Sequence, residues 1–253
     1  MDSLRGKKIV VCGGSRGIGR AVVDLLLQQK AEVLMVALDQ ERLRDNARFF
    51  AEKFPSGKLS VCSIDLSADG SDQALAEFTA GFPQVDGLAL TIGNGRPIEG
   101  SKTQRFVLSA KQNLFPGINS FYGLQPALNK SESASCVFVS SIVARELVDC
   151  PVEYAATKSS LEVYVKHWSQ QYSPIRFNVV APGNVLTDGS VWDYRKQTDP
   201  KGLESWLESA VPLGRLSTAA EIAQSIVFLL SSQSSFITGS TITVDGGQTR
   251  SFS

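Results

Sequence analysis

The stretch Gly13-Gly14-Ser15-Arg16-Gly17-Ile18-Gly19 decides the fold, because it joins the apolar run Lys8–Cys12 to a helical pattern at Ile18–Gln29. Glycine lets a backbone approach a pyrophosphate closely, and a helix N-terminus offers free N–H groups and the positive end of its dipole. The spacing is Gly-x-x-x-Gly-x-Gly rather than the commoner Gly-x-Gly-x-x-Gly. The turn therefore indicates a dinucleotide site, although a purely steric need for glycine stays open at this point.

Further apolar runs of strand length follow, and they are nearly continuous, as expected for parallel strands covered on both faces. The predicted strands are Lys8–Cys12, Glu32–Ala37, Leu59–Ile64, Gly87–Ile92, Cys136–Ser141, Arg176–Ala181 and Thr241–Val244. The predicted helices are Ile18–Gln29, Gln40–Phe54, Asp72–Phe82, Phe106–Asn129, Glu153–Tyr172 and Ala219–Leu230. This order predicts right-handed crossovers and a doubly wound, three-layer α/β/α fold, with one domain over residues 1–253.

The least regular segment is Asn184–Pro212, which contains two tryptophans and the charged run Asp193–Lys196. A long irregular stretch in a compact domain is often a lid over a site, so we expect a substrate lid at about residues 186–212. A surface excursion without a role in binding is the alternative.

Composition limits the partners. The chain has 253 residues with 25 basic and 25 acidic side chains, so no long-range field favours nucleic acid or an anionic membrane. Four cysteines form no CxxC pair and His167 is the only histidine, so we expect reduced thiols, no metal site and a cytoplasmic location. The charged Met1–Lys8 segment lacks a signal-peptide pattern, and no apolar run approaches the ~20 residues of a membrane helix.

The end of the second strand bears on the cofactor. Many NAD enzymes place an acid there to bind the 2′-hydroxyl of the adenosine ribose, but this position holds Ala37, followed by Leu38 and Asp39. Without that acid a 2′-phosphate is not repelled, and Arg16 can pair with it. The residues favour NADP(H), while NAD(H) stays possible because Asp39 is close by. At the third strand, Asp65 is placed either to accept from the adenine amino group or to cap a helix ahead of Asp72.

Tyr154 and Lys158 stand one helical turn apart, so their side chains share a face. A phenol has a pKa of about 10 in water, and a nearby ammonium lowers it towards the pH at which acid/base catalysis works best. Ser140 and Ser141 end the fifth strand thirteen residues upstream of this turn, at the edge where open parallel sheets bind ligands. Asn113 interrupts a helical pattern, which leaves backbone groups free to bind a water, or marks a simple helix irregularity.

In their order along the chain, these residues resemble the short-chain dehydrogenase/reductase family over almost the whole length. The matching set also includes Pro182-Gly183 with Thr187, the tail Pro212-Leu-Gly-Arg-Leu216, Phe228-Leu-Leu, Thr238-Gly239 and Val244-Asp-Gly-Gly247. The resemblance implies a seven-stranded Rossmann-type sheet and NAD(P)(H)-dependent hydride transfer between nicotinamide and a carbonyl or alcohol carbon.

The resemblance also implies residue roles. Tyr154 is the acid/base, Ser141 orients the carbonyl, Lys158 holds the nicotinamide ribose, and Asn113 supports a water that continues the proton relay. The cofactor residues carried over are Gly13, Ser15, Arg16, Gly17, Ile18, Gly19, Ala37, Leu38, Asp65, Leu66, Thr91, Gly93, Tyr154, Lys158, Pro182, Gly183, Val185 and Thr187.

Two positions depart from the family pattern. Its opening Thr is Cys12, and its Asn-Asn-Ala-Gly is Leu90-Thr91-Ile92-Gly93. The second Asn of that motif braces the central sheet in the family, whereas Thr91 supplies one hydroxyl and no amide. We expect altered packing around the adenosine and unchanged chemistry.

The nearest subgroup resembles β-ketoacyl-carrier-protein reductases and their secondary-metabolism relatives, which does not fix the substrate. Candidate substrate residues are Arg96, Val143, Arg145 and Trp192, although such residues are more often packing residues or solvated charges. Arg145 would meet an acidic group, and Trp192 with Trp206 would cover an apolar or ring-shaped substrate.

Two other functions are alternatives. One is a non-catalytic dinucleotide-binding sensor or scaffold, which would not need Tyr154 and Lys158 together. The other is a sugar-nucleotide epimerase or dehydratase, which the short chain disfavours. The family also implies a homotetramer or homodimer, with helices Phe106–Leu128 and Leu161–Trp168 at one interface and Thr241–Ser253 at another. The alternative is that these apolar stripes face only their own sheet.

Overall fold

The computed structural model describes residues 4–251. The first three residues of Met1–Lys8 and the last two of the predicted interface segment Thr241–Ser253 lie outside this range. Seven strands form one parallel sheet in the order β3-β2-β1-β4-β5-β6-β9, which confirms the predicted doubly wound sheet. They are β1 (Lys8–Cys12), β2 (Glu32–Ala37), β3 (Lys58–Ser63), β4 (Gly87–Leu90), β5 (Ser135–Val139), β6 (Arg176–Pro182) and β9 (Thr241–Val244). Two short strands, β7 (Val185–Leu186) and β8 (Ser217–Thr218), form a separate pair.

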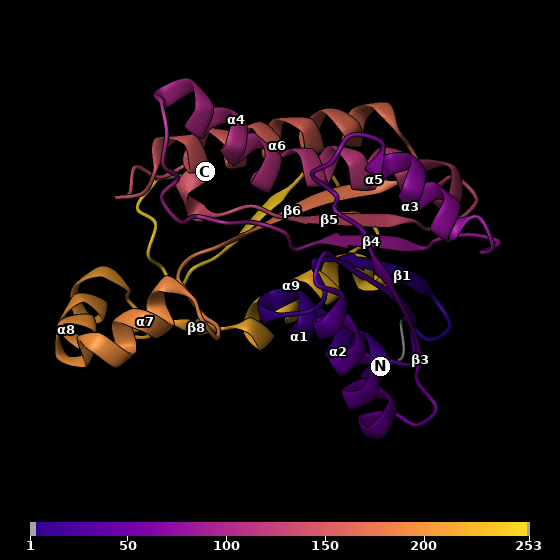
Figure 1. The fold of residues 1–253 in the computed structure, drawn as a ribbon, viewed down its shortest axis with the longest axis horizontal. Helices are drawn as coiled ribbons and strands as arrows, with labels where there is room; N and C mark the ends of the chain where they lie inside the picture. The colour runs from indigo at the N-terminus through magenta and orange to yellow at the C-terminus, as the bar shows by residue number, and fades with distance from the viewer. Residues whose placement is uncertain (1–3, 252–253) are drawn as a thin grey trace.

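Helices cover both faces of the sheet (Figure 1). On one face lie α1 (Gly17–Gln28), α2 (Gln40–Lys53) and α9 (Ala219–Leu230). On the other lie α3 (Ser71–Thr79), α4 (Lys102–Asn113), α5 (Phe115–Leu128) and α6 (Val152–Gln171). Short helices η1 (Ile142–Ala144), η2 (Ser232–Ser234), α7 (Val191–Thr198) and α8 (Pro200–Ala210) complete the described chain.

The strands are apolar throughout because the two faces belong to two separate cores. Ile9 and Val11 of β1 pack into the core under α1, α2 and α9, whereas Val10 and Cys12 pack into the core under α5 and α6. Successive side chains of a strand point to opposite faces, so burial on both sides requires the continuous apolar pattern.

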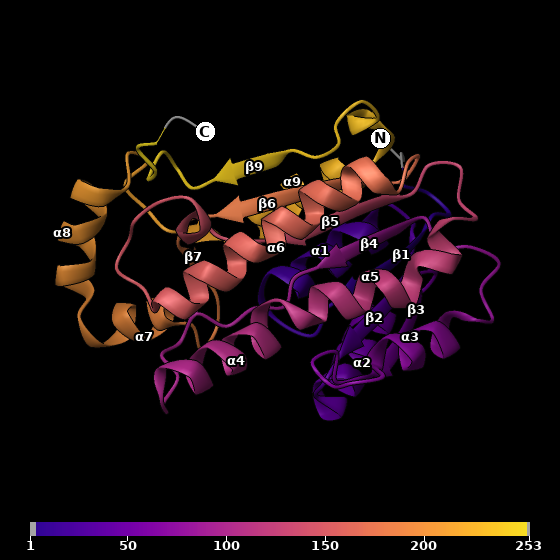
Figure 2. The same cartoon turned by 90° about the horizontal axis from the view of Figure 1, so that it is seen from above.

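The order of the strands reverses beside β1, which pairs with β2 on one side and β4 on the other. In open α/β sheets, ligands bind outside the carboxyl ends of the strands at such a switch point. Helices α7 and α8 lie beyond the ends of β6 and β9, at this same edge (Figure 2). The fold therefore brings the glycine turn, the start of α6 and the α7–α8 segment to one edge of the sheet.

Two features differ from the predicted elements. The single helix predicted over Phe106–Asn129 is divided at Leu114, since α4 ends at Asn113. Pro116 lies in the first turn of α5, where its missing N–H costs no helical hydrogen bond. The prediction of irregular structure for Asn184–Pro212 is wrong, since most of the segment forms α7 and α8. Ser190 and Asp199 cap these helices, accepting from the N–H groups of residues 193 and 202.

Among the described residues, no helix combines the length and the apolar composition that crossing a membrane requires.

Candidate active site

The glycine turn leads directly from β1 into α1. Gly13 has φ +90° and donates its N–H to the Val36 carbonyl at 2.8 Å, and Gly17 begins the helix at φ +52°. Gly19 has no room for a side chain, since a Cβ there would lie 2.2 Å from the Gly13 carbonyl oxygen. Arg16, the N-cap residue, gives α1 no side-chain hydrogen bond. The helix therefore presents uncapped N–H groups behind a close-packed turn, which fits a pyrophosphate.

Asn46 of α2 holds this turn, and the sequence analysis missed it. Its Nδ2 donates to the Ser15 carbonyl at 3.0 Å and its Oδ1 accepts from Arg20 Nε at 2.7 Å. Asn46 is buried, so both ends of its amide are in use. An amide on the apolar face of a predicted helix was the signal that could have revealed it.

The residues at the end of β2 are arranged as the NADP(H) interpretation requires. Ala37 ends the strand, Leu38 is 67% exposed, and Asp39 turns to α2. The Asp39 carboxylate accepts from the Arg42 N–H at 3.0 Å and pairs with its guanidinium at 3.0 Å. The backbone hydrogen bond from Arg42 is the largest cause of a lowered pKa at Asp39. Asp39 is therefore engaged with its own helix.

Asp65 caps a turn directly after β3. Its Oδ1 accepts from the N–H of Ser67 at 2.9 Å and from its hydroxyl at 2.6 Å, and these bonds lower the pKa of Asp65. The N-cap of α3 is Gly70. Asp65 therefore caps a local turn and is not the cap of the helix near Asp72. The neighbouring Leu66 is buried, and Asn119 Nδ2 donates to its carbonyl at 3.0 Å.

Thr91 takes over part of the bracing expected of an amide. Its hydroxyl donates to the Cys12 carbonyl at 3.0 Å, and its backbone N–H donates to the same oxygen at 2.9 Å. The loop that follows lies against the reacting side chains. A Cβ on Gly93 would lie 2.9 Å from Lys158 Nζ, and one on Gly95 would lie 3.1 Å from the Tyr154 ring.

Asn113 occupies the last position of α4 and is buried. Its Oδ1 accepts from the Asn94 N–H at 2.7 Å, and its Nδ2 donates to the Asn94 and Ser109 carbonyls, each at 3.1 Å. Asn113 and Lys158 both border Gly93. The side chain that ends the helix therefore fixes the loop at Asn94, beside the lysine.

Ser141 and Tyr154 meet at the start of α6. Ser141 caps η1, where its Oγ accepts from the Val143 N–H at 3.4 Å. Burial raises the pKa of Tyr154, and a hydrogen bond with Ser141 opposes that rise in part. The direction is opposite to the one expected from Lys158 alone, because loss of solvent around the phenolate is the larger effect. Tyr154 is thus a protonated phenol at neutral pH.

Lys158 is buried, with 2% of its surface exposed. Its Nζ donates to the Val139 carbonyl at 2.9 Å and to the Ile92 carbonyl at 3.3 Å, where β5 and β4 have just ended. Burial lowers its pKa to about 8, and the charge of Glu162 opposes that change. A cation with a pKa in this range gains or loses its proton close to neutral pH, which suits a group that moves or stabilises protons.

The segment after β6 returns to the glycine turn. Gly183 donates to the Val244 carbonyl at 3.0 Å, and Thr187 lies beside Gly17, whose Cβ would be 3.5 Å from the threonine methyl. Val185 forms β7, which pairs with β8. Pro182, Gly183 and Thr187 are therefore at the same edge of the sheet as the turn and α6.

The four predicted substrate residues have separate surroundings. Arg96 Nη2 donates to the Gly189 carbonyl at 2.6 Å, which joins the loop after β4 to the segment before α7. Arg145 pairs with Glu162 at 2.6 Å and donates to Thr241 Oγ1 at 2.7 Å. Trp192 stacks on Trp206, with ring centres 4.9 Å apart. Val143 is a half-buried member of η1.

Known proteins share this fold and this length. A family model described as Enoyl-(Acyl carrier protein) reductase matches residues 13–249. Isoepoxydon dehydrogenase patN of Aspergillus clavatus is 30% identical over 256 residues, covering 97% of this chain and 95% of the relative. The 3-oxoacyl-(acyl-carrier-protein) reductase FabG of Chlamydia muridarum is 31% identical, covering 98% of this chain and 99% of the relative. An NADPH-bound short chain oxidoreductase of Pseudomonas aeruginosa PAO1, described as containing an atypical catalytic center, is 26% identical with a TM-score of 0.87, covering 97% of this chain and 98% of that one.

The chain therefore belongs to the short-chain dehydrogenase/reductase family, which confirms the resemblance seen in the sequence. The protein is an oxidoreductase of this family, acting between a CH–OH group and a carbonyl with a nicotinamide cofactor.

Proposed function

We propose that this protein reduces a small-molecule carbonyl, or oxidises the matching alcohol, with Tyr154 as general acid/base. The observation that carries the proposal is the position of Lys158. A buried ammonium stands one helical turn from a half-buried phenol that is hydrogen-bonded to Ser141. Paired groups with shifted pKa values at the ligand-binding edge of a sheet are typical of catalytic sites.

In reduction, Tyr154 donates its phenolic proton to the substrate oxygen, which Ser141 holds by a second hydrogen bond. The ammonium of Lys158 stabilises the phenolate that remains, since an opposite charge nearby favours the ionised form. Asn113 fixes the loop that borders Lys158 and leaves backbone groups of the α4–α5 junction for a relay water. Bound nicotinamide supplies or accepts the hydride. In oxidation, Tyr154 takes the proton back from the alcohol.

The proposal includes NADP(H) as the preferred cofactor, with NAD(H) possible. Ala37 leaves no acid at the end of β2, Asp39 is engaged with Arg42, and Arg16 is exposed at the glycine turn. The solved relative from Pseudomonas aeruginosa is NADPH-bound. Gly13–Gly19 would hold the pyrophosphate, Asp65 with Leu66 the adenine, Lys158 the nicotinamide ribose, and Pro182–Val185 with Thr187 the nicotinamide.

Replacement of Tyr154 by Phe tests the acid/base role, because it removes the hydroxyl and keeps the ring. Proton transfer by a positioned side chain contributes roughly 10²–10⁴-fold, so we expect kcat to fall by at least about 10²-fold. NADPH binding should change little. Consumption of NADPH is measured with a panel of ketones and aldehydes that wild type reduces. Near-normal turnover by Tyr154→Phe would refute the role, and tight NADPH binding without turnover of any carbonyl by wild type would favour a sensor.

Separate fluorescence titrations with NADPH and NADH test the cofactor preference. We expect NADPH to bind more tightly, and Arg16→Ala to weaken NADPH binding by about tenfold, since it removes one charge-assisted contact to the 2′-phosphate. The same variant should leave the affinity for NADH nearly unchanged. Tighter binding of NADH by tenfold or more would contradict the preference.

We also propose an oligomeric state, a cellular location and a substrate lid for this protein. A homotetramer or homodimer is supported by large apolar side chains that α4, α5 and α6 expose, namely Phe106, Val107, Leu108, Tyr122 and Val163. A cytoplasmic location is supported by four free cysteines. The segment at about residues 186–212 is proposed as the substrate lid of one domain that spans residues 1–253. Its tether by Arg96 supports that role.

A further inference from the structure

Glu162 stands one turn beyond Lys158 on α6, so the helix carries Tyr154, Lys158 and Glu162 at successive turns. Its side chain is nine-tenths buried. Oε2 accepts from Arg145 Nε at 2.6 Å, whereas Oε1 is buried with no hydrogen-bond partner among the described residues. A buried carboxylate that is only half satisfied is costly, so its retention calls for a physical reason.

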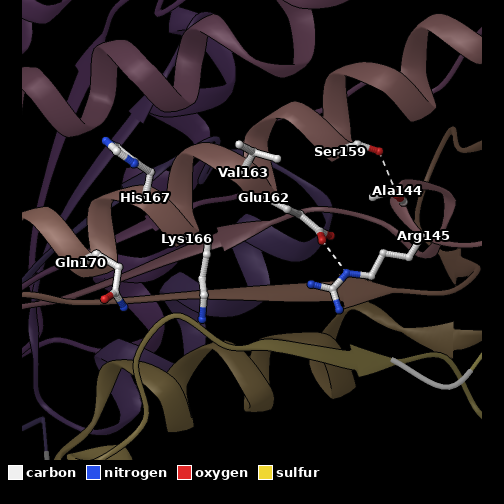
Figure 3. Close-up of a pocket in the computed structure, with 8 residues that line it drawn as sticks. All are labelled: Ala144, Arg145, Ser159, Glu162, Val163, Lys166, His167 and Gln170. Atoms are coloured by element: carbon white, nitrogen blue, oxygen red, sulfur yellow. Dashed lines mark hydrogen bonds and ion pairs between the residues drawn. The ribbon is translucent and has the colours of Figure 1, made fainter.

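Arg145 connects this carboxylate to two other elements. It follows η1, the turn whose first hydrogen bond is made by Ser141, and its Nη2 donates to Thr241 of β9 at 2.7 Å. Ser159, next to Lys158 in the chain, donates its hydroxyl to the Ala144 carbonyl at 2.7 Å. Figure 3 shows the ion pair of Glu162 with Arg145 and the hydrogen bond from Ser159 to Ala144 side by side. Two side chains of α6 therefore hold the turn that carries Ser141.

Few charged side chains lie near Glu162 and Lys158 in the described part of the chain. Arg145, Lys166 and His167 line the same surface groove as Glu162, and β9 contributes the hydroxyl of Thr241. Lys158 faces Tyr154 on its own helix, the Asn113 amide across Gly93, and the carbonyls of Val139 and Ile92. Burial lowers the pKa of Lys158, and the carboxylate of Glu162 opposes that effect. Arg145 has 40% of its side chain exposed, so solvent screens its charge more than that of Glu162.

We infer that Glu162 is a positioning residue for the proposed reaction, which keeps Lys158 in its ammonium form by charge, while Arg145 fixes Glu162 in place. The inference rests on the proposed function, because it acts through the lysine of that site. Burial disfavours an ammonium, and a carboxylate one turn away in a poorly solvated environment offsets part of that effect. In this arrangement Arg145 is held on α6 and β9.

Titration of Lys158 by NMR tests the charge effect without any substrate. The whole protein is labelled with [6-¹³C]lysine, and the Lys158 signal is assigned by its absence from Lys158→Arg. We expect a titration midpoint near 8 in wild type. Glu162→Gln, which keeps size and removes charge, should lower the midpoint by about half a pH unit or more. Glu162→Asp should restore part of that shift.

Two further variants separate a charge effect from a broken structure. Glu162→Gln leaves Arg145 without its carboxylate partner, so the double variant Arg145→Gln with Glu162→Gln removes both charges. We expect the double variant to keep the lowered midpoint, because the carboxylate itself supports Lys158. Glu153→Gln is the control, since it removes a carboxylate of the same helix that pairs with Arg105 at 3.0 Å. It should leave the midpoint unchanged.

An unchanged midpoint in Glu162→Gln, or a return to the wild-type midpoint in the double variant, would overturn the inference. With a carbonyl that wild type reduces, the alkaline fall of kcat should move to lower pH in Glu162→Gln, while KM for that carbonyl stays within about twofold. A wild type that reduces no carbonyl refutes the proposed function, and the NMR titration still decides the charge effect. Turnover by wild type with an unmoved pH profile in Glu162→Gln refutes the inference alone.

Discussion

The three tryptophans of this chain lie in two regions that are built in opposite ways. Trp168 of α6 is 1% exposed, and its ring lies 4.7 Å from Phe121, 5.5 Å from Phe138 and 6.1 Å from Phe177, centre to centre. Trp192 and Trp206 stack on each other on α7 and α8, with the Arg195 guanidinium 5.8 Å and 5.5 Å from their ring centres. Trp168 is buried in the core beside the sheet, whereas Trp192 and Trp206 are packed against each other.

The difference follows from how each segment meets the rest of the molecule. Helix α6 buries a stripe of residues from Thr157 to Ser169 and packs against β6 and α4, so it holds Tyr154 and Lys158 on a rigid element. Helix α7 buries none of its residues and α8 buries only Leu203. Reacting groups on a rigid helix keep their geometry, and a loosely attached segment at the same edge can change without disturbing them.

Trp168→Ala should have the largest effect on the free energy of unfolding. Removal of a buried aromatic side chain costs about 3–5 kcal/mol, since the transfer free energy is lost and a cavity remains. We expect that decrease in the free energy of unfolding by denaturant titration, with a lower transition midpoint. A decrease below about 1.5 kcal/mol would show that the aromatic cluster repacks and that α6 is less rigid than its packing indicates.

Lys158→Met gives the next effect, and it has the opposite sign for stability. A pKa lowered from 10.5 to about 8 corresponds to about 3 kcal/mol of destabilisation while the buried amine is charged. Because the folded-state pKa lies below the unfolded value, wild type bears this cost in full below pH 8, and it fades as pH rises towards 10.5. We expect Lys158→Met to be more stable by up to about 3 kcal/mol at pH 7, and inactive.

The pH dependence provides the check on Lys158→Met. Denaturant titrations at pH 7 and pH 10 should show the stability gain of the variant shrinking at the higher pH. Lys166→Met is the matched control, because this lysine of the same helix is exposed and donates to the Gly239 carbonyl at the surface. A variant that is less stable than wild type at pH 7 would contradict the expected balance between burial and charge.

Most of the sheet could be predicted because continuous apolar runs have few alternatives. All seven predicted strands form. Their ends differ by at most two residues from the prediction, as at Ile92 and Ser141, which lie beyond the ends of β4 and β5. The α7–α8 segment could not be predicted in the same way. Helix α7 buries none of its residues, and its cap Ser190 and the cap of α8, Asp199, are common loop residues as well. Helix α8 does have an apolar pattern at helical spacing, in Leu203, Trp206 and Leu207, and this pattern was the signal that could have revealed it.

The site shows a similar division. Residues of the reacting group stand at spacings along single elements, so Tyr154 and Lys158 could be found from the chain alone. Asn46 and Asn94 bind residues of other segments, so only the folded chain shows their partners. Glu162 stands one turn beyond Lys158, but its burial and its ion pair with Arg145 depend on the fold. The raised pKa of Tyr154 could not be predicted either, because it depends on how completely the folded chain excludes water from the phenol.

Trp192→Ala is the smallest expected effect and the sharpest test of the comparison. A stacked pair contributes about 0.5–1.5 kcal/mol beyond its buried area, and α7 buries none of its residues, so the free energy of unfolding should fall by much less than in Trp168→Ala. Hydrogen exchange should become faster in residues 191–210 and stay unchanged in α6, because the two regions share no ring contact. If this segment is the lid, kcat/KM for bulky carbonyls should change more than for small ones. A loss of stability as large as that of Trp168→Ala would mean that the stacked pair belongs to the core, and the distinction between the two regions would fail.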